Sequence, residues 1–487
     1  MTDLTSPSQR RERTFLGHPR QLATLFGVEM WERFSFYGMQ GILLIYMYYS
    51  VAEGGLAIDQ GVAAGIVGAY GGTVYLSTIL AAWSADRLFG PERMLFGSAV
   101  SVMAGHIALA LLPGGAGLAV GLVLVALGSG GIKASASTIL ATLYGEGDDR
   151  RDAGFSIFYL GVNIGAFSGP LLTGLLQSTW GFHVGFGLAA VGMAAGLAQY
   201  SVNRHKLPES GREVPNPLPA AARTKLGGTA VAVLLVVAAL VATGVITADR
   251  LKWIVFGIVV IATITYFTLM LRSPKVTAVE RRRVIAFMPM WVASAVFWAI
   301  FQQIFTVLTI YADERLNRTV LGWEMPVSWT QSIEPVFVIL LAGVFAAVWT
   351  KMGPRQPSSP MKMAAGTVIV GVAFVLFTLF AGTGANGTPL LALVGILLIF
   401  CLAELFTSPV GQSLSTKLAP MAFRTQMVAL FFLSVSMGTV LSGLLAEFYS
   451  EENEVAYFGI TGLVAIVVGL AVAATVPKLK VLMEGVR

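Results

Sequence analysis

The residues of this chain that are best suited to chemistry are charged side chains inside one long apolar segment. Residues 21–49 are largely apolar, yet they contain Glu29, Glu32, Arg33, Tyr37 and Gln40. The spacing i, i+3, i+4, i+8 and i+11 predicts that these five side chains share one face of a helix. Each charge inside a bilayer costs about 2.5–3.5 kcal/mol on insertion scales, so this face must meet protein or water. It is expected either to form a structural ion pair between helices or to line a site.

Three further apolar segments each contain one polar residue. Lys133 follows a Gly-rich stretch, and it is expected to balance the excess acid of the first segment or to bind an anionic substrate group. Asn163 lies mid-segment, where an amide either joins helices or serves a site. Glu404 precedes Pro409 and Gly411, which are expected to break or kink their helix and free backbone groups.

Glu334 has two interpretations. It lies seventeen residues before Lys351, or about 25 Å along a helix, which places it toward the outer third of a bilayer as a solvated carboxylate. Alternatively it joins Glu404 in a site. Arg33 and Lys133 lie early in the chain and both acids lie late, so a site between the two parts would have one positive and one negative wall. Such a site suits a zwitterion.

The composition excludes most other classes of protein. Of 487 residues, 56% are hydrophobic and 12% are charged, whereas soluble globular chains carry about 25% charged residues. A soluble enzyme and a disordered chain are therefore both excluded. The single cysteine, Cys401, and four scattered histidines predict no disulfide and no metal site. No nucleotide-binding loop is recognisable, so no cofactor is expected.

Long apolar runs with few charges predict membrane helices. Fourteen such runs are found, at 21–49, 60–83, 93–112, 117–143, 153–176, 182–202, 226–247, 251–271, 284–311, 329–350, 363–382, 389–416, 424–449 and 456–476. The first six and the last six form two blocks of similar length. Two six-helix halves are typical of major facilitator transporters, whose substrate site lies midway through the membrane between the halves.

This pattern divides the chain into seven parts. They are a cytoplasmic tail at 1–20, a six-helix bundle at 21–202, a linker at 203–225, two inserted helices at 226–271, a linker at 272–283, a second six-helix bundle at 284–476 and a tail at 477–487. The inserted pair carries almost no charge, so it is expected at the periphery against lipid, without site residues.

Lys and Arg are concentrated in the tails and in alternate loops. The N-terminal tail has Arg10, Arg11, Arg13 and Arg20, whereas one loop of the opposite set has Glu451, Glu452 and Glu454. The positive-inside rule places both termini in the cytoplasm. The net charge of +6 follows from this orientation and implies no nucleic-acid partner.

Four motifs resemble those of the proton-dependent oligopeptide transporter family of the major facilitator superfamily. They are Glu29-x-x-Glu32-Arg33-Phe34-Ser35-Phe36-Tyr37-Gly38, Gly72-x-x-Tyr75-Leu76 with Ala85-Asp86-Arg87-x-x-Gly90, Phe155-Ser156-Ile157-Phe158-Tyr159-x-Gly161-x-Asn163-x-Gly165 and Glu404-Leu405-x-x-Ser408-Pro409-Val410-Gly411. The resemblance covers nearly the whole chain. It implies an all-α membrane protein with the major facilitator fold, in a bacterial inner membrane.

The resemblance also implies functional residues. The substrate site is expected to comprise Arg33, Tyr37, Tyr75, Lys133, Asn163, Trp298, Gln302, Glu334, Glu404 and Phe431. Arg33 and Lys133 would hold the peptide carboxylate, and Glu404 with Asn163 would hold the amino terminus. Proton coupling is expected to involve Glu29, Glu32, Arg33, Lys133 and Glu334.

Three positions depart from the family pattern. Gln302 stands where the family usually has an acid, Glu334 stands where it often has Asn, and Phe431 stands where it usually has Trp. Gln302 cannot titrate, so we expect Glu334 to take over proton binding and, with Glu404, to favour cationic peptides.

The expected function is a monomeric, proton-coupled symporter that imports di- and tripeptides by alternating access, with peptides, protons and membrane lipid as its partners. Two alternatives remain. One is transport of another charged nitrogenous solute, and the other is a peptide sensor that does not transport. No Ser-His or metal-binding constellation is recognisable, so an enzyme is not expected.

Overall fold

The computed structural model describes residues 14–145, 148 and 150–486. Arg10, Arg11, Arg13 and Arg487, which contributed to the predicted orientation, lie outside the described residues. Apolar segments form helices because a helix satisfies its own backbone hydrogen bonds without water. The long helices are α1 Gln21–Tyr48, α2 Gln60–Ser84, α3 Pro91–Leu111, α4 Gly114–Thr142, α5 Arg151–Trp180, α6 Phe182–Asn203, α7 Ala220–Ala242, α8 Ala248–Arg272, α9 Ala278–Phe301, α11 Ile333–Met352, α12 Ser359–Val375, α13 Leu390–Lys417, α14 Arg424–Ala446 and α15 Glu454–Leu482.

Each of the fourteen predicted segments overlaps one of these helices. Thirteen helical stretches among the described residues are long and apolar enough to cross a membrane. The remaining helix, α1, is equally long but carries Glu29, Glu32 and Arg33. The predicted all-α membrane fold is therefore confirmed.

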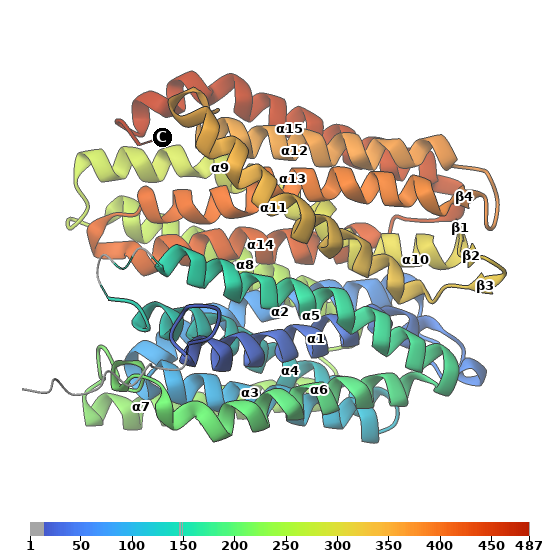
Figure 1. Ribbon diagram of the computed structural model, residues 1–487, viewed down its shortest axis with the longest axis horizontal. Coiled ribbons are helices and arrows are strands. Elements are labelled where there is room, and N and C mark those ends of the chain that lie inside the picture. Colours follow the sequence, from blue (N-terminus) through green and yellow to red (C-terminus); the bar gives the residue numbers. More distant parts are fainter. Residues whose placement is uncertain (1–13, 146–147, 149, 487) are drawn as a thin grey trace, which may run out of the picture.

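The helices form two groups (Figure 1). Helices α1–α6 pack with one another and form the first group, and α9–α15 form the second. Helix α11 runs obliquely across the second group. The groups meet where α2 packs against α14, and where α5 packs against α11 and the preceding 3-10 helix η6, Val327–Ser332. These two seams leave space between the groups.

Small residues allow the α2–α14 seam to be tight. A Cβ atom at Gly68 would lie 2.8 Å from the Cα of Gly443, closer than real Cβ contacts. Close backbone approach through small residues is typical of membrane helices. The hydroxyl of Ser436 adds a hydrogen bond to the backbone oxygen of Gly72 across the same seam.

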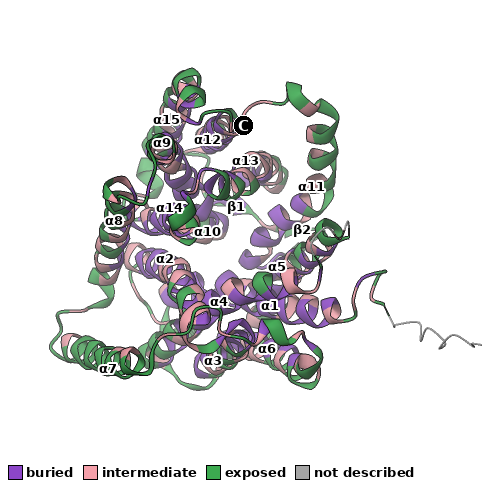
Figure 2. Cartoon of the chain, turned by 90° about the vertical axis from the view of Figure 1, so that its left-hand side faces the viewer, coloured by how far each residue is buried: buried purple, intermediate pink, exposed green. Residues whose placement is uncertain are grey.

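The two inserted helices differ from each other. Helix α7 has no buried residue and lies apart from both groups in Figure 2. Its observed start is six residues earlier than predicted. Helix α8 packs against α2, α9 and α14, so it is only partly peripheral. Lys252, near the predicted start of the second inserted helix at 251, is 2% exposed and forms an ion pair with Glu447. The reason is a tertiary contact with α14 that hydropathy does not reveal.

Helix breaks occur at different places from those expected. Helix α13 runs without interruption through Pro409, and Gly411 serves close packing, because a Cβ there would lie 2.7 Å from the ring of Phe431. The predicted segment 284–311 is broken instead. Helix α9 ends at Phe301, and the 3-10 helix η5, Gln302–Phe305, leads into α10, Val307–Glu314.

Short strands join the ends of the helices in the second group. Strand β1, Leu316–Asn317, pairs in parallel with β4, Thr388–Pro389. Strand β2, Thr319–Val320, pairs antiparallel with β3, Trp323–Glu324.

Candidate functional site

A cavity of about 710 Å³ lies between the two helix groups. Its wall comes from α1, α2, α4 and α5 on one side and from α9, α11, α13 and α14 on the other. All ten predicted substrate-site residues line it, namely Arg33, Tyr37, Tyr75, Lys133, Asn163, Trp298, Gln302, Glu334, Glu404 and Phe431. The fold brings these residues together, and their individual roles stay predictions.

Arg33 is the centre of an ion cluster on the first wall. Its Nε atom lies 3.1 Å from an oxygen of Glu29 and 2.7 Å from an oxygen of Glu32. Its Nη2 atom is buried and makes no hydrogen bond to any described residue. The two acids therefore hold Arg33 through Nε, and a terminal nitrogen stays available for an anionic ligand.

Glu32 does not share the cavity face that the spacing predicted. Its side chain is fully buried, and it accepts a hydrogen bond of 2.7 Å from the hydroxyl of Ser129 on α4. Glu29, Arg33, Tyr37 and Gln40 do line the cavity. Glu32 lies at the edge of the helix face that Glu29, Arg33, Tyr37 and Gln40 share. Its contact with α4 therefore decides whether its side chain points into the cavity or into the first helix group.

Lys133 contacts aromatic rings and forms no salt bridge with Glu29 or Glu32, although balancing these acids was one of its two predicted roles. Its Nζ atom lies 4.4 Å from the ring centroid of Tyr75 and 5.6 Å from that of Phe432 on α14. Among the described residues it forms no salt bridge. Aromatic faces stabilise an ammonium group by cation–π attraction. Lys133 is therefore held in place without a counter-charge, which leaves its charge for a ligand.

The second wall contains two acids in contact. The side chains of Glu334 and Glu404 lie next to each other and interact electrostatically. Glu334 is 9% exposed and lines the cavity, so its interpretation as a solvated outer carboxylate is wrong. Glu334 and Lys351 do lie on one continuous helix, α11, but that helix runs obliquely and its first turn borders the central cavity. Two neighbouring carboxylates repel each other, so this arrangement favours a proton on one of them.

The broken helix places Gln302 at the cavity. Gln302 begins η5, and its Nε2 atom donates a hydrogen bond of 3.1 Å to the hydroxyl of Thr439. Tyr75 of the other wall lies beside Gln302. Trp298, one turn earlier, has a buried indole nitrogen without a partner among the described residues. Discontinuous helices are a frequent feature of transporter binding sites.

Phe432, Gln40 and Gln331 are among the lining residues that were not predicted to bind substrate. Phe432 follows Phe431 directly and stacks on Tyr75 with ring centroids 6.5 Å apart. Gln40 and Gln331 are buried, and in the described structure each has a side-chain oxygen without a hydrogen-bond partner. A signal existed for Gln40, which shares the stripe of Arg33, and for Gln331, which lies three residues before Glu334. Neither signal distinguishes a site residue from a core amide.

The cavity is closed at the end of the molecule away from the C-terminus. There the hydroxyls of Tyr48 and Tyr49 donate hydrogen bonds of 2.7 and 2.9 Å to Asp313 of the second group. Ser328 and Trp329 donate to the backbone oxygens of Pro170 and Leu171. In the described structure, hydrogen bonds between the two groups occur at this end or midway along the helices.

Known proteins resemble this chain over nearly its whole length. The sequence profile of the POT family matches residues 93–464. A di-/tripeptide transporter of Lactococcus lactis subsp. cremoris is 38% identical over 98% of this chain and 99% of its own length. An uncharacterized transporter, YclF, of Bacillus subtilis is 40% identical over 98% of this chain and 97% of its own.

Solved structures of transporters also match the fold of this chain. A peptide transporter POT in complex with sulfate is 46% identical, with a TM-score of 0.93 over 97% of this chain and 98% of its own. A POT family transporter in complex with 5-aminolevulinic acid is 37% identical, with a TM-score of 0.91 over 96% of this chain and 98% of its own. The two helix groups and the cavity between them are thus those of a membrane transporter fold.

Proposed function

The chain belongs to the POT family, and from this premise we propose that it carries di- and tripeptides across a membrane together with protons. One observation carries the proposal. The cavity between the helix groups has a basic wall with Arg33 and Lys133 and an acidic wall with Glu334 and Glu404. A peptide backbone presents a carboxylate and an ammonium group at opposite ends, and this arrangement of charges complements it.

The peptide carboxylate binds Lys133 and the available edge of Arg33. The ammonium group binds Glu404, with Asn163 beside it. Asn163 donates through Nδ2 to the backbone oxygen of Tyr159, so its side-chain oxygen can accept from the ligand. Tyr37 and Tyr75, with Trp298 and Phe431, pack against the body of the peptide. A cavity of about 710 Å³ lies within the usual range of small-ligand sites.

Proton coupling uses both walls. On the first wall, Glu29, Glu32, Arg33 and Lys133 form a cluster in which a proton and a peptide carboxylate compete for the same positive charges. On the second wall, Glu334 and Glu404 share a proton while the cavity is empty. A substrate ammonium group favours the ionised form of this pair, so peptide binding drives proton release. Gln302 takes no part in proton transfer because an amide does not titrate.

Transport proceeds by alternating access, with one helix group rocking against the other. Both termini face the cytoplasm of a bacterial inner membrane, since Lys and Arg accumulate at that side. The contacts of Tyr48 and Tyr49 with Asp313 then close the outer side, so the structure corresponds to an inward-facing state. The protein acts as a monomer and catalyses no covalent reaction.

The test is uptake of a labelled dipeptide by proteoliposomes, with and without an inward proton gradient. Saturable uptake that the gradient stimulates, and that unlabelled di- and tripeptides inhibit, supports the proposal. Binding without uptake would instead indicate a sensor. A second candidate substrate is a short amino acid with separated charges, because a related structure was solved with 5-aminolevulinic acid. Competition by that compound but not by dipeptides would favour this alternative.

A further inference from the structure

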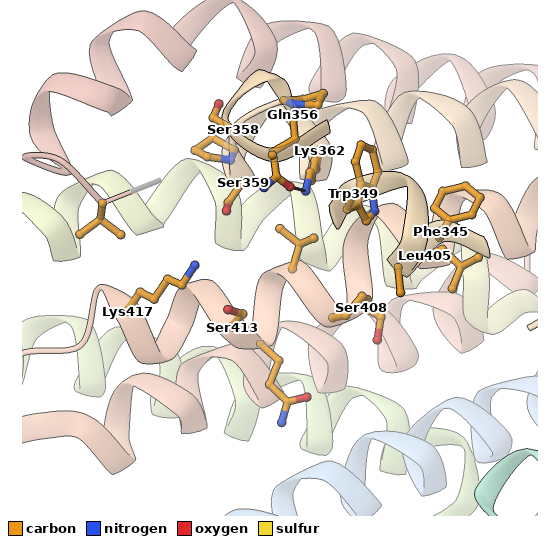
Figure 3. A pocket seen from close by; sticks show the side chains of 18 of the residues that line it. Phe345, Trp349, Gln356, Ser358, Ser359, Lys362, Leu405, Ser408, Ser413 and Lys417 are labelled. Carbon is orange, nitrogen blue, oxygen red and sulfur yellow. Dashed lines mark hydrogen bonds between the residues drawn. The ribbon is translucent and has the colours of Figure 1, made fainter. Parts of the chain in front are cut away.

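A second cavity, of about 1080 Å³, lies between α11, α12 and α13 and the end of α15 (Figure 3). We call it the α11 crevice. Its deep end reaches Glu404, Ser408 and Gln412, which also line the central cavity. Its other end lies near the last described residues of the chain, Gly485 and Val486. The crevice therefore extends from the substrate cavity toward the membrane surface.

The surface end of the α11 crevice is basic. Lys362, Lys417 and Lys480 line it, together with Ser358, Ser359 and Ser413. Lys362 is only 8% exposed, its Nζ atom donates a hydrogen bond of 2.7 Å to Gln356, and the same atom lies 4.0 Å above the ring of Trp349. Of the described residues that line the crevice, Glu404 at the deep end is the one acid. The surface end is thus suited to a negative charge.

The first turn of α12 also favours binding of a negative charge at the surface end of the crevice. Helix α12 begins at Ser359, and its N-cap residue, Ser358, has a buried hydroxyl without a partner among the described residues. A helix N-terminus attracts anions through its partial positive charge and its unpaired backbone N–H groups. Ser358, Ser359 and Lys362 all line the crevice. The hydroxyl of Ser358, the N-terminus of α12 and the ammonium group of Lys362 can therefore bind the same anion.

The rest of the crevice wall is apolar and borders the membrane. Phe345 and Trp349 of α11 face Leu405 of α13 across it. The other side of α11 is exposed, with Leu340 at 63% and Val344 at 55%. These exposed aliphatic side chains on a membrane-spanning helix mark a surface that meets lipid. The crevice therefore combines a basic polar end with an apolar body at the protein–lipid boundary.

We propose that the α11 crevice binds an anionic phospholipid of the adjacent leaflet. The phosphate lies near Lys362 and Lys480 and the N-terminus of α12, and one acyl chain lies along Phe345, Trp349 and Leu405. This inference rests on the proposed membrane orientation, which places the crevice at the cytoplasmic leaflet, where anionic lipids are attracted by basic groups. A free phosphate ion would fill only the polar end, whereas a lipid uses the apolar wall as well.

The test uses the full-length protein, stripped of lipid in detergent and titrated with phosphatidylglycerol or with phosphatidylcholine of the same chain length. Native mass spectrometry counts bound lipid, and this readout does not depend on transport. We expect phosphatidylglycerol to bind at least fivefold more tightly. We expect Lys480→Gln to weaken its binding about fivefold, equivalent to about 1 kcal/mol, and Lys362→Gln with Lys480→Gln to remove the preference. Lys480 is exposed, so its single variant retains the fold.

Lys351→Gln is the matched control, because Lys351 is an exposed lysine at the same end of α11 but does not line the crevice. It should leave the preference unchanged. Equal binding of both lipids by the unaltered protein would overturn the proposal. Full competition by inorganic phosphate would assign the site to a free anion, and competition by a dipeptide alone would assign the crevice to the substrate pathway. Either result would also overturn the proposal, while the transport assay would stand independently.

Discussion

Glu334 and Glu404, seventy residues apart in the chain, lie next to each other on the wall of the central cavity. Helix α11 contributes one acid and α13 the other. Two carboxylates in contact repel each other unless they share a proton. Arg33 and Lys133 line the same cavity from the other helix group.

Replacement of Glu334 by Gln tests whether this pair carries the transported proton. The amide still donates a hydrogen bond to Glu404, but it cannot release a proton. We expect uptake driven by a proton gradient to fall at least tenfold, while gradient-free exchange of peptide across the membrane continues. We also expect the preference for lysyl peptides to weaken, since one negative charge is lost.

Both quantities are measured in the same proteoliposomes. The exposed Glu452→Gln variant removes an acid far from the cavity and should change neither. If gradient-driven uptake and lysyl-peptide preference are both unaltered in Glu334→Gln, then proton coupling belongs to Glu29 and Glu32 alone.

Arg33 and Lys133 are expected to bind the peptide carboxylate. Replacing either with Ala should weaken dipeptide binding about 10- to 100-fold, because a hydrogen bond to a charged group contributes about 1.5–3 kcal/mol. Lys133→Arg should restore binding only in part, since a planar guanidinium does not fit the aromatic contacts of a compact ammonium. Equilibrium binding on purified, monodisperse protein measures this directly. Near-normal affinity in both alanine variants would refute the assignment.

Tyr48 and Tyr49 are expected to keep the outer end closed through Asp313. Removing both hydroxyls, by Tyr48→Phe with Tyr49→Phe, deletes two hydrogen bonds to a charged acceptor and should shift the population toward the outward-open state. Spin labels placed on the two helix groups at this end should report a longer distance. Tyr159→Phe, on the cavity wall away from this end, is the control. An unchanged distance distribution would show that other contacts close the outer side.

The α2–α14 seam should tolerate no added side-chain volume at Gly68. A valine there would overlap the backbone of Gly443, and overpacking of this kind typically costs about 1–3 kcal/mol. We expect Gly68→Val to lower the midpoint of thermal unfolding in detergent. Gly257→Val on α8 is the matched control, because a Cβ there meets no atom within 4 Å. Equal midpoints for both variants would contradict the close approach of the two helices.

Much of the candidate site could be predicted from the chain alone. Apolar length and charge placement determined the number of membrane segments, because a bilayer requires about twenty apolar residues per helix and accepts buried charges only at a cost. The charges on the first segment, with Lys133 and Glu404, indicated either a site or a structural ion pair, because ionisable groups within lipid must face protein or water. The motif resemblance then added Tyr75, Trp298 and Phe431, whose types alone indicate only core packing.

Only the tertiary structure decided how these residues meet. Helical periodicity assigned Glu32 to the cavity face, but contact with Ser129 turns it into the first helix group. Charge counting paired Lys133 with an acid, whereas Tyr75 and Phe432 hold it. Residue counting gave the position of Glu334 along α11, but it could not show that this helix runs obliquely and brings its first turn to the central cavity. Periodicity and hydropathy describe one helix at a time, while the rotation, tilt and breaks of each helix depend on the neighbours that long-range packing supplies.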